Sequence, residues 1–372
     1  MPSKALRGVL GRIIVASWSF VFAFGSSPSL LRASGGPPAE SISGDQTIVR
    51  AVVAYPRPPT KFRPLSASDA ELEGYGFPPR PDPLMAPRPY AHWKKLVSVP
   101  RVANAVLRQT TIYHGPVQNL LIGKALRNGM LSATSLNWSG YAVGGASGTF
   151  ASNNSLISAE WVVPRAQQGF GVCDGSWDYS SQWIGFDGLG SNEVLQAGTE
   201  ADAYCSGSTQ AESYYSWIEW APAPSIFVSI PPARPGDLMV SSVWYTTTPP
   251  FGHAYLINYT LYQAQAYAFN PPPSTTFAGN SAEWIEERPT LSNGLANLAN
   301  YLADQFNFSY ASNSGNYFTP GASPAGTTTY ALSMTCPPWT PGSSCPSTTV
   351  ISTPYLYGGV TSWFYDSGPA LY

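Results

Sequence analysis

The chain has 372 residues, of which 11% are charged, whereas charged residues make up about 25% of an average globular protein. Tyr (22), Trp (12), Gly (34) and Pro (36) are abundant, a balance that favours an exported, β-rich protein over a helical cytosolic one. The length allows one large β-sandwich preceded by a leader region.

Charge is divided sharply along the chain. Residues 1–130 carry sixteen Lys and Arg and six acidic residues, a net of +10, whereas residues 131–372 carry three Arg, no Lys and fifteen acidic residues, a net of −12. We interpret the two parts as a basic pro-segment and an acidic mature domain, which attract each other until the carboxylates become protonated. A domain without lysine also gains little positive charge in acid, so self-repulsion stays small there.

A basic arm that binds nucleic acid or membrane is the alternative interpretation of the first part. It lacks any dense Lys/Arg run, and we therefore expect no nucleic-acid partner.

The N-terminus has the pattern of a secretory signal peptide. Lys4, Arg7 and Arg12 precede the apolar run 13–25, and small residues follow it. The run is too short to span a membrane comfortably. We predict a signal peptide over residues 1–34, a secreted, extracellular product and no membrane attachment once the signal is removed.

Residues 35–135 are predicted to be a basic, Pro-rich propeptide that inhibits its own domain. From 35 to 100 the chain is rich in proline and poor in apolar periodicity, which indicates an extended segment that orders only against a partner surface. Between 102 and 130 the spacing of apolar residues permits short helices.

Residues 136–372 are predicted to form an all-β domain. Short runs of alternating Val, Ile, Trp, Tyr and Thr are separated by Gly, Pro, Asn and Ser, a texture typical of an antiparallel sandwich or barrel. The leucine spacing of residues 291–306 predicts one helix or helical loop. The expected strands are 138–143, 155–163, 180–186, 193–198, 213–220, 226–230, 238–245, 254–261, 265–269, 282–287 and 358–365.

All four cysteines lie in the acidic part of the chain. In an exported protein two disulfides are expected, and we favour Cys173 with Cys205 and Cys336 with Cys345 among three possible pairings. A metal site is disfavoured because there is no CxxC pair and residues 131–372 contain one histidine,. We expect neither a metal nor another cofactor.

Two short segments hold polar residues that are hard to explain as structure. Gln196 is an amide within a run that otherwise reads as buried strand, and Glu283, Glu286 and Glu287 lie within five residues. In a strand, Glu283, Ile285 and Glu287 share one face. A carboxyl on a half-apolar face tends to have a raised pKa, which suits proton transfer, although these residues also fit the solvent face of an amphipathic strand.

Several catalytic classes lack their residues in this sequence. A Ser/His or Cys/His mechanism needs an imidazole, and the acidic domain has only His253; nucleotide-binding and HExxH motifs are absent,. Carboxyl chemistry remains. A glycoside hydrolase could use Glu219, Asp187 and Glu283 or Glu287, and a lectin-like module could stack sugars on the same aromatic residues.

Seven motifs occur in an order that resembles the glutamic peptidases, or eqolisins: NWSGY, AEWVVP, QWIGFDG, LQAG, SWIEWAP, PGD and AEWIEE. The resemblance covers residues 137–289. It implies a concanavalin or jelly-roll-like sandwich of two curved antiparallel sheets, and a secreted acid endopeptidase made as a precursor. Departures are Ala197, where Thr is commoner, Glu286, where an apolar residue is usual, and Arg288, where an acid often follows.

The resemblance also implies the site residues. Gln196 and Glu287 would be catalytic, and the cleft would contain Trp138, Trp183, Asp187, Trp217 and Glu219. Asp187, between Phe186 and Gly188, fits a turn equally well, and most aromatic residues in such a domain are packing residues.

Elementary chemistry agrees with a pair of Glu and Gln. Glu287 can take a proton from water and pass it to the leaving amine, and the Gln196 amide can donate to the tetrahedral oxyanion. Whether Glu287 starts ionised or protonated remains open. We expect a monomer that acts on polypeptides, with the carbohydrate-active sandwich as the alternative.

Overall fold

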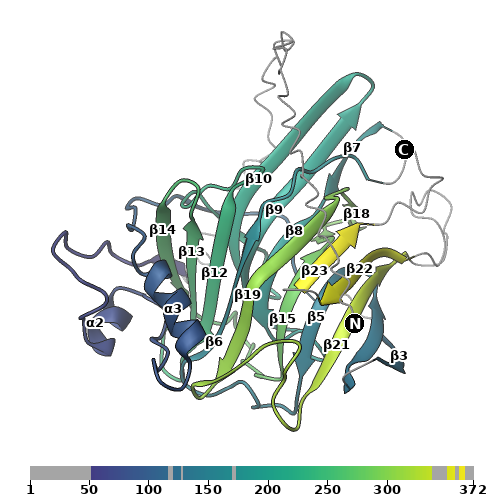
Figure 1. The fold of residues 1–372 in the computed structure, drawn as a ribbon. Helices are drawn as coiled ribbons and strands as arrows, with labels where there is room; N and C mark the ends of the chain where they lie inside the picture. The colour runs from purple at the N-terminus through teal and green to yellow at the C-terminus, as the bar shows by residue number, and fades with distance from the viewer. Residues whose placement is uncertain are drawn as a thin grey trace, which may run out of the picture. The chain divides into compact units, whose positions relative to one another are not determined.

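Alternating apolar residues in short runs build two mostly antiparallel β-sheets that pack face to face (Figure 1),. The computed structural model describes residues 52–115, 120–126, 129–169, 173–336, 350–356 and 360–364. These residues belong to one compact unit, 36–372. The predicted signal peptide lies outside the described residues. No helix in the described part of the chain is long and apolar enough to cross a membrane.

The first sheet has the strand order β1-β14-β13-β12-β6-β19-β20. Its strands are β1 (Val52–Ala54), β6 (Ser155–Val162), β12 (Leu238–Tyr245), β13 (Gly252–Asn258), β14 (Gln263–Phe269), β19 (Ala303–Asn313) and β20 (Asn316–Phe318). β19 belongs to both sheets, because its beginning pairs with β23 and its end pairs with β6.

The second sheet carries the site. Its central order is β2-β11-β10-β9-β8-β15-β5-β21. These strands are β2 (Leu107–Gln109), β5 (Trp138–Gly144), β8 (Ser181–Phe186), β9 (Val194–Ser206), β10 (Thr209–Ala221), β11 (Ile226–Val228), β15 (Ser281–Glu287) and β21 (Thr328–Thr335). It also includes β3 (Leu121–Ala125), β4 (Leu131–Ser135), β7 (Asp174–Tyr179), β18 (Asn297–Leu298), β22 (Val350–Leu356) and β23 (Val360–Phe364). Among the described strands, only β18 with β7 and β21 with β4 pair in parallel.

The main hydrophobic core lies between the sheets, and the second sheet carries another apolar layer on its opposite face. In β15, Ala282 and Trp284 belong to the main core, whereas Ile285 packs in the other layer with Trp183 and Trp217. The predicted division of this strand into two faces is therefore confirmed. Glu287 shares the face of Ile285 by the two-residue period of a strand.

The predicted all-β sandwich is confirmed, and most predicted strands occur within a few residues of their expected bounds. The predicted helix over 291–306 is wrong. The segment forms a two-stranded ribbon of β16 (Thr290–Leu291) and β17 (Gly294–Leu295), then β18 and the start of β19. Leu302 is 58% exposed while Leu298 is 1% exposed, so the spacing of the leucines does not mark one buried helical face. Pairing with distant strands overrides the local pattern.

The predicted propeptide is more ordered than its composition suggests. It forms β1, β2, β3, β4 and two helices, α2 (Asp69–Gly74) and α3 (Pro87–Leu96). The expectation of short helices between 102 and 130 is wrong, because β2 and β3 lie there and extend the second sheet. Ser68 and Glu71 form a capping box at the start of α2,.

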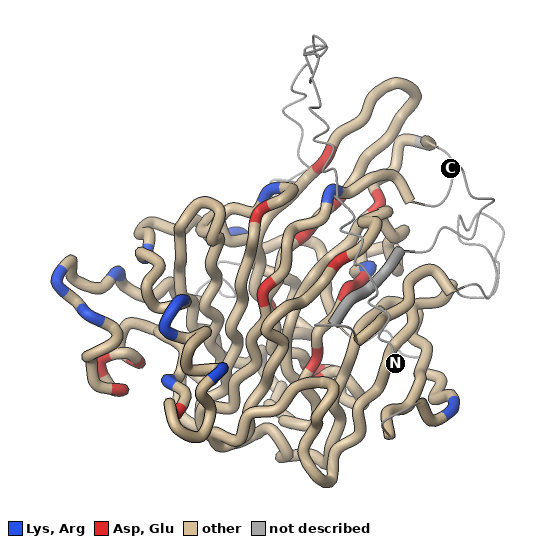
Figure 2. Tube along the Cα trace, viewed as in Figure 1, with Lys and Arg blue, Asp and Glu red and all other residues tan. Residues whose placement is uncertain are grey.

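The leader packs on both sheets of the domain. Trp93 and Leu96 of α3 pack against Val240, Trp244 and Tyr255 of the first sheet, outside the sandwich core. In Figure 2, many Lys and Arg lie on the leader, in the loop before α2 and along α3, while most Asp and Glu lie along the sandwich strands and a few lie on α2. The division of charge along the sequence is thus also a division in space.

One predicted disulfide is confirmed. Cys173 is bonded to Cys205, which lies on β9. The second predicted pair needs Cys345, which lies outside the described residues.

Candidate active site

Gln196 and Glu219 face each other across two long paired strands. They are direct partners in the register of β9 and β10, so their side chains leave the sheet on the same face. Gln196 is fully buried and Glu219 is 2% exposed. Burial raises the pKa of Glu219 to about 7, against the opposing hydrogen bond and charge of His114.

Glu287 is at the end of β15, between β5 and β8. Its Oε2 accepts a hydrogen bond from Trp183 Nε1 at 2.7 Å, and its Oε1 accepts one from Asn137 Nδ2 at 2.8 Å. Burial raises the pKa of Glu287 to about 8, and the charge of His114 and the hydrogen bonds from Gly115 and Asn137 oppose that rise. The carboxyl group is therefore buried but well supplied with N–H donors.

A segment of the leader crosses this face of the sheet between the two side chains. The backbone oxygen of His114 accepts a hydrogen bond from Gln196 Nε2 at 2.8 Å. The next backbone nitrogen, of Gly115, donates to Glu287 Oε1 at 3.2 Å. Gln196 and Glu287 therefore contact the two ends of one peptide bond, and Asn137 Nδ2 fixes the following carbonyl, of Gly115, at 2.7 Å.

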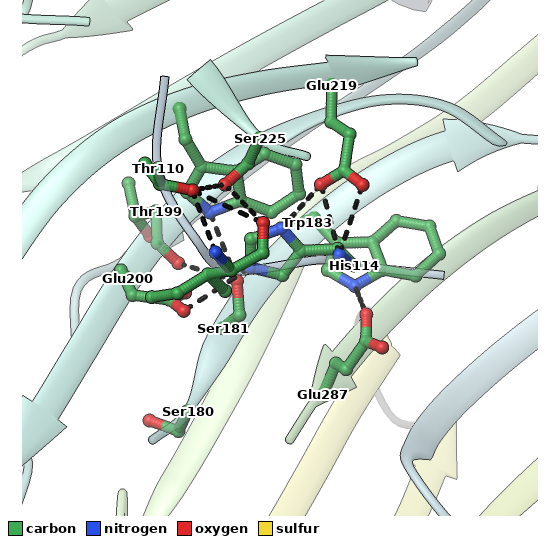
Figure 3. Close-up of polar contacts among 12 residues, drawn as sticks. Thr110, His114, Ser180, Ser181, Trp183, Thr199, Glu200, Glu219, Ser225 and Glu287 are labelled. Carbon is green, nitrogen blue, oxygen red and sulfur yellow. Dashed lines mark hydrogen bonds and ion pairs between the residues drawn. The ribbon is translucent and has the colours of Figure 1, made fainter. Parts of the chain in front are cut away.

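The side chain of His114 is enclosed by acidic and aromatic groups. Its Nδ1 lies 2.7 Å from Glu219 Oε2, and its Nε2 lies 3.3 Å from Glu200 Oε1. The imidazole stacks on Trp217 with ring centroids 3.8 Å apart and planes 2° apart. Figure 3 shows Glu219 and Glu287 both pointing toward His114 and Trp183. Burial lowers the pKa of His114, but the charge of Glu200 and the hydrogen bonds to both glutamates raise it to about 10.

Of the other residues predicted for the cleft, Trp138 lies beside Glu287 and Asp187 lies in a turn. Trp138 packs edge-on against Trp183, with ring centroids 5.1 Å apart, so both tryptophans adjoin Glu287. Asp187 lies in a turn with φ of 74° and accepts hydrogen bonds from the backbone nitrogens of Ala278 and Asn280. Its role in the structure is to anchor that loop, and burial raises its pKa to about 7.

Three residues that shape the site were not predicted as site residues. His114 lies in the leader, Glu200 lies four residues after Gln196 on the same strand, and Asn137 precedes Trp138. The two-residue period of β9 is a signal for Glu200, because it places residues 196 and 200 on one face. No comparable signal exists for His114, since its neighbours come from strands about 100 residues away.

A metal has no evident place here. No group of three or more His, Cys, Asp or Glu side chains in the described ranges could hold an ion. The chemistry available to the site is that of its amide, its carboxyl groups and its N–H donors.

The comparison with family models shows which family the chain belongs to. The model of the peptidase A4 family matches residues 136–344. The chain belongs to the peptidase A4 family. This A4 peptidase is accordingly a hydrolase of peptide bonds, in place of the carbohydrate-active alternative, and the match begins one residue before Asn137.

Solved structures of similar proteins include glutamic peptidases. Scytalido-glutamic peptidase with a transition state analog inhibitor is 24% identical, with a TM-score of 0.47, and the match covers 62% of this chain and 98% of that one. SCP-B, titled a member of the Eqolisin family, is 24% identical at a TM-score of 0.44 with the same coverage. Aspergilloglutamic peptidase from Aspergillus niger is 24% identical at a TM-score of 0.40, covering 50% of this chain and 99% of that chain. A comparison with curated protein sequences gives no match.

Proposed function

We propose that this A4 peptidase is made as a secreted, monomeric precursor and hydrolyses polypeptides in acid by means of Gln196 and Glu287. The observation that carries the proposal is the peptide bond between His114 and Gly115. Its oxygen accepts a hydrogen bond from Gln196 and its nitrogen donates one to Glu287. A substrate bond held in the same way would have each group next to the atom whose charge changes during hydrolysis.

Each step of peptide hydrolysis has a group available. Glu287 takes a proton from the attacking water and later passes it to the leaving nitrogen. Gln196 Nε2 donates to the carbonyl oxygen as it becomes an oxyanion. Gln196 Oε1 is buried and has no hydrogen-bond partner among the described residues, so it is free to accept from the water.

Trp183 and Asn137 support Glu287 in this role. Both donate to its carboxylate oxygens, and hydrogen bonds to the charged form of a carboxyl group favour that form. They oppose the effect of burial, which still raises the pKa of Glu287 to about 8 while the leader covers the carboxyl group. The tightly packed neighbours also fix the orientation of the carboxyl group.

The leader would act as the inhibitor of its own domain because it occupies the space between Gln196 and Glu287. Among the described residues, the ion pairs that join leader to domain all use leader histidines: His92 with Glu160 at 3.7 Å, and His114 with Glu200 and Glu219. Protonation of Glu219, whose pKa burial raises to about 7, neutralises one carboxylate partner of the His114 ring in acid. We therefore expect the leader to separate in acid, and unchanged retention of it between about pH 3 and 7, where carboxylates lose their charge, would contradict this switch.

The test of the catalytic assignment uses the full-length chain incubated in acid with a denatured protein. Glu287→Gln and Gln196→Ala are each expected to abolish hydrolysis while the fold, followed by circular dichroism, is retained. Pepstatin is expected to leave hydrolysis intact because no pair of aspartates is involved, and a polysaccharide is expected to stay uncut.

Glu212→Gln is the matched control. Glu212 lies on β10, as Glu219 does, but it pairs with Arg165 on the surface and its loss should leave hydrolysis unchanged. Ordinary activity in Glu287→Gln or Gln196→Ala would remove the assignment of the site.

A further inference from the structure

The residue before the held peptide bond occupies a built pocket. His114 is 1% exposed, and its ring is surrounded by side chains of three strands of the second sheet. Trp217 and Glu219 come from β10, Glu200 from β9, and Glu287 lies on β15 next to the following residue. Because the strands are paired over long registers, the pocket is part of the rigid sheet and not of a loop.

The pocket matches a flat cation. Trp217 provides an aromatic face parallel to the imidazole, and cations bind favourably to such faces. The carboxylates of Glu219 and Glu200 lie at the two opposite nitrogens of the ring. Only a protonated imidazole can donate from both nitrogens at once, so the two acceptors together select the charged form.

The other titratable groups around the ring are also acidic or neutral. Asp202 of β9 and Glu287 of β15 both interact electrostatically with His114. Tyr215 of β10 and Tyr179 of β7 interact with Glu200 and are neutral at working pH, since burial raises the pKa of each of these phenols. The named groups on β9, β10 and β15 that can carry charge are therefore carboxyl groups, and in their ionised form they favour a positive guest.

We propose that this pocket, formed by Trp217, Glu200 and Glu219, selects a planar cationic side chain, foremost histidine, immediately before the bond to be cut. We further propose that the leader's own bond between His114 and Gly115 is the first bond that the enzyme cuts. This inference rests on the proposed function, because it takes Gln196 and Glu287 as the groups that define the cut.

The step on the leader balances as ordinary hydrolysis. Water adds its oxygen to the carbonyl carbon of His114, and Glu287 receives one proton of that water. The bond from this carbon to the nitrogen of Gly115 then breaks, and Glu287 returns the proton to that nitrogen. The products are a carboxylate on His114 and a new N-terminal amine on Gly115, so residues before 115 are released from the domain.

The first experiment compares matched peptides on the acid-incubated full-length enzyme, assayed at the highest pH at which it still cuts the Leu peptide, because the pocket attracts a cation only while its carboxyl groups are ionised. The peptides differ only in the residue before a single cleavable bond, which is His, Asn or Leu. A hydrogen bond to a charged group contributes about 1.5–3 kcal/mol, so we expect kcat/KM for the His peptide to exceed that for the Asn peptide by at least about tenfold. Equal values for the two peptides, in an enzyme that hydrolyses both, would overturn the pocket assignment and leave the proposed function standing.

The second experiment tests the pocket residues directly. In Glu200→Gln and in the double variant with Glu219→Gln, the preference for His over Asn should fall toward one while the Leu peptide is still cut. Glu212→Gln should keep the preference. If Glu200→Gln kept the full preference, the proposed pocket would be wrong. If a variant fails to fold, the comparison of peptides on the wild type still decides.

The third experiment identifies the first cut in the leader. The N-termini that appear when the full-length chain is moved to acid are determined by mass spectrometry over time. We expect Gly115 to be the earliest new N-terminus, and we expect His114→Leu to slow its appearance by about tenfold or more. A first cut elsewhere would overturn this part of the inference, whereas a wild type that cuts neither its leader nor a denatured protein would overturn the proposed function itself.

Discussion

Replacement of His114 by Ala should loosen the segment of the leader that covers the site. The change removes a ring that contacts Glu219 Oε2 at 2.7 Å and Glu200 Oε1 at 3.3 Å and stacks on Trp217. Loss of one partner of a buried ion pair costs about 3–5 kcal/mol. Because Glu219 can take up a proton once the imidazole is gone, we take the lower end, ~3 kcal/mol, which is roughly a 10²-fold increase in the opening equilibrium,.

Amide hydrogen exchange at pH 7 measures this opening. The Glu287→Gln background keeps the chain uncut during the measurement, and the amides of His114 and Gly115 report on the segment because they donate to Glu219 and to residue 287. We expect both amides to exchange about 10²-fold faster in His114→Ala, since exchange follows the population of the open form. Unchanged protection would show that His114 does not hold the segment in place.

Arg63→Ala is the control for a lost basic side chain. Arg63 is a leader residue whose guanidinium, among the described residues, donates hydrogen bonds to the carbonyls of Thr60 and Phe62 at 3.3–3.5 Å. Its removal should leave the exchange of the His114 and Gly115 amides unchanged. An equal acceleration in Arg63→Ala would point to a general effect of leader charge, and not to the pocket.

Three further outcomes are expected. Burial raises the pKa of Asp304 to about 8 and that of Glu286 well above its ordinary value, so the folded state binds more protons than the unfolded state between about pH 4 and 8. Stability to urea should therefore be highest in acid and fall by about 1.4 kcal/mol per pH unit for each such group. Asp304→Asn should flatten this dependence, and a stability that rises with pH would contradict it. Trp183→Phe removes a donor to Glu287 Oε2 and should shift the acidic limb of the pH dependence of kcat/KM to higher pH, whereas an unshifted limb would argue against Glu287 as the group that titrates there. Cys173→Ser opens a disulfide that closes a separation of 32 residues and should lower the free energy of unfolding by about 2–4 kcal/mol, measured by denaturant titration with and without reductant.

The local sequence pattern was sufficient to predict most strands and to find the motifs that carry the site residues. The alternation around Glu287 predicted which of its neighbours share its face of the strand, because a strand has a fixed two-residue period. The pattern of residues 291–306 predicted a helix that does not form, since leucine spacing does not report that Leu298 lies in a strand parallel to β7.

The occupant of the site could not be predicted from the sequence at all. His114 contacts Glu200 and Glu219, which are 86 and 105 residues away, and no periodicity extends over such a separation. The opposite net charges of the two parts predicted that leader and domain attract each other. They did not predict that the leader's histidines, and not its many Lys and Arg, make the ion pairs to the domain in the described part of the chain.

The short leader strands β1 and β2 have a consequence for the enzyme after activation. β1 pairs with β14 at one margin of the first sheet, and β2 pairs with β11 at one margin of the second. When the leader departs, the backbone N–H and C=O groups on those sides of β14 and β11 lose their partners, and such unpaired rows are templates for pairing with another chain. If the leader departs as proposed, two unpaired strand edges would therefore be exposed at the moment of activation, and a leader fragment that stayed nearby could pair with them again.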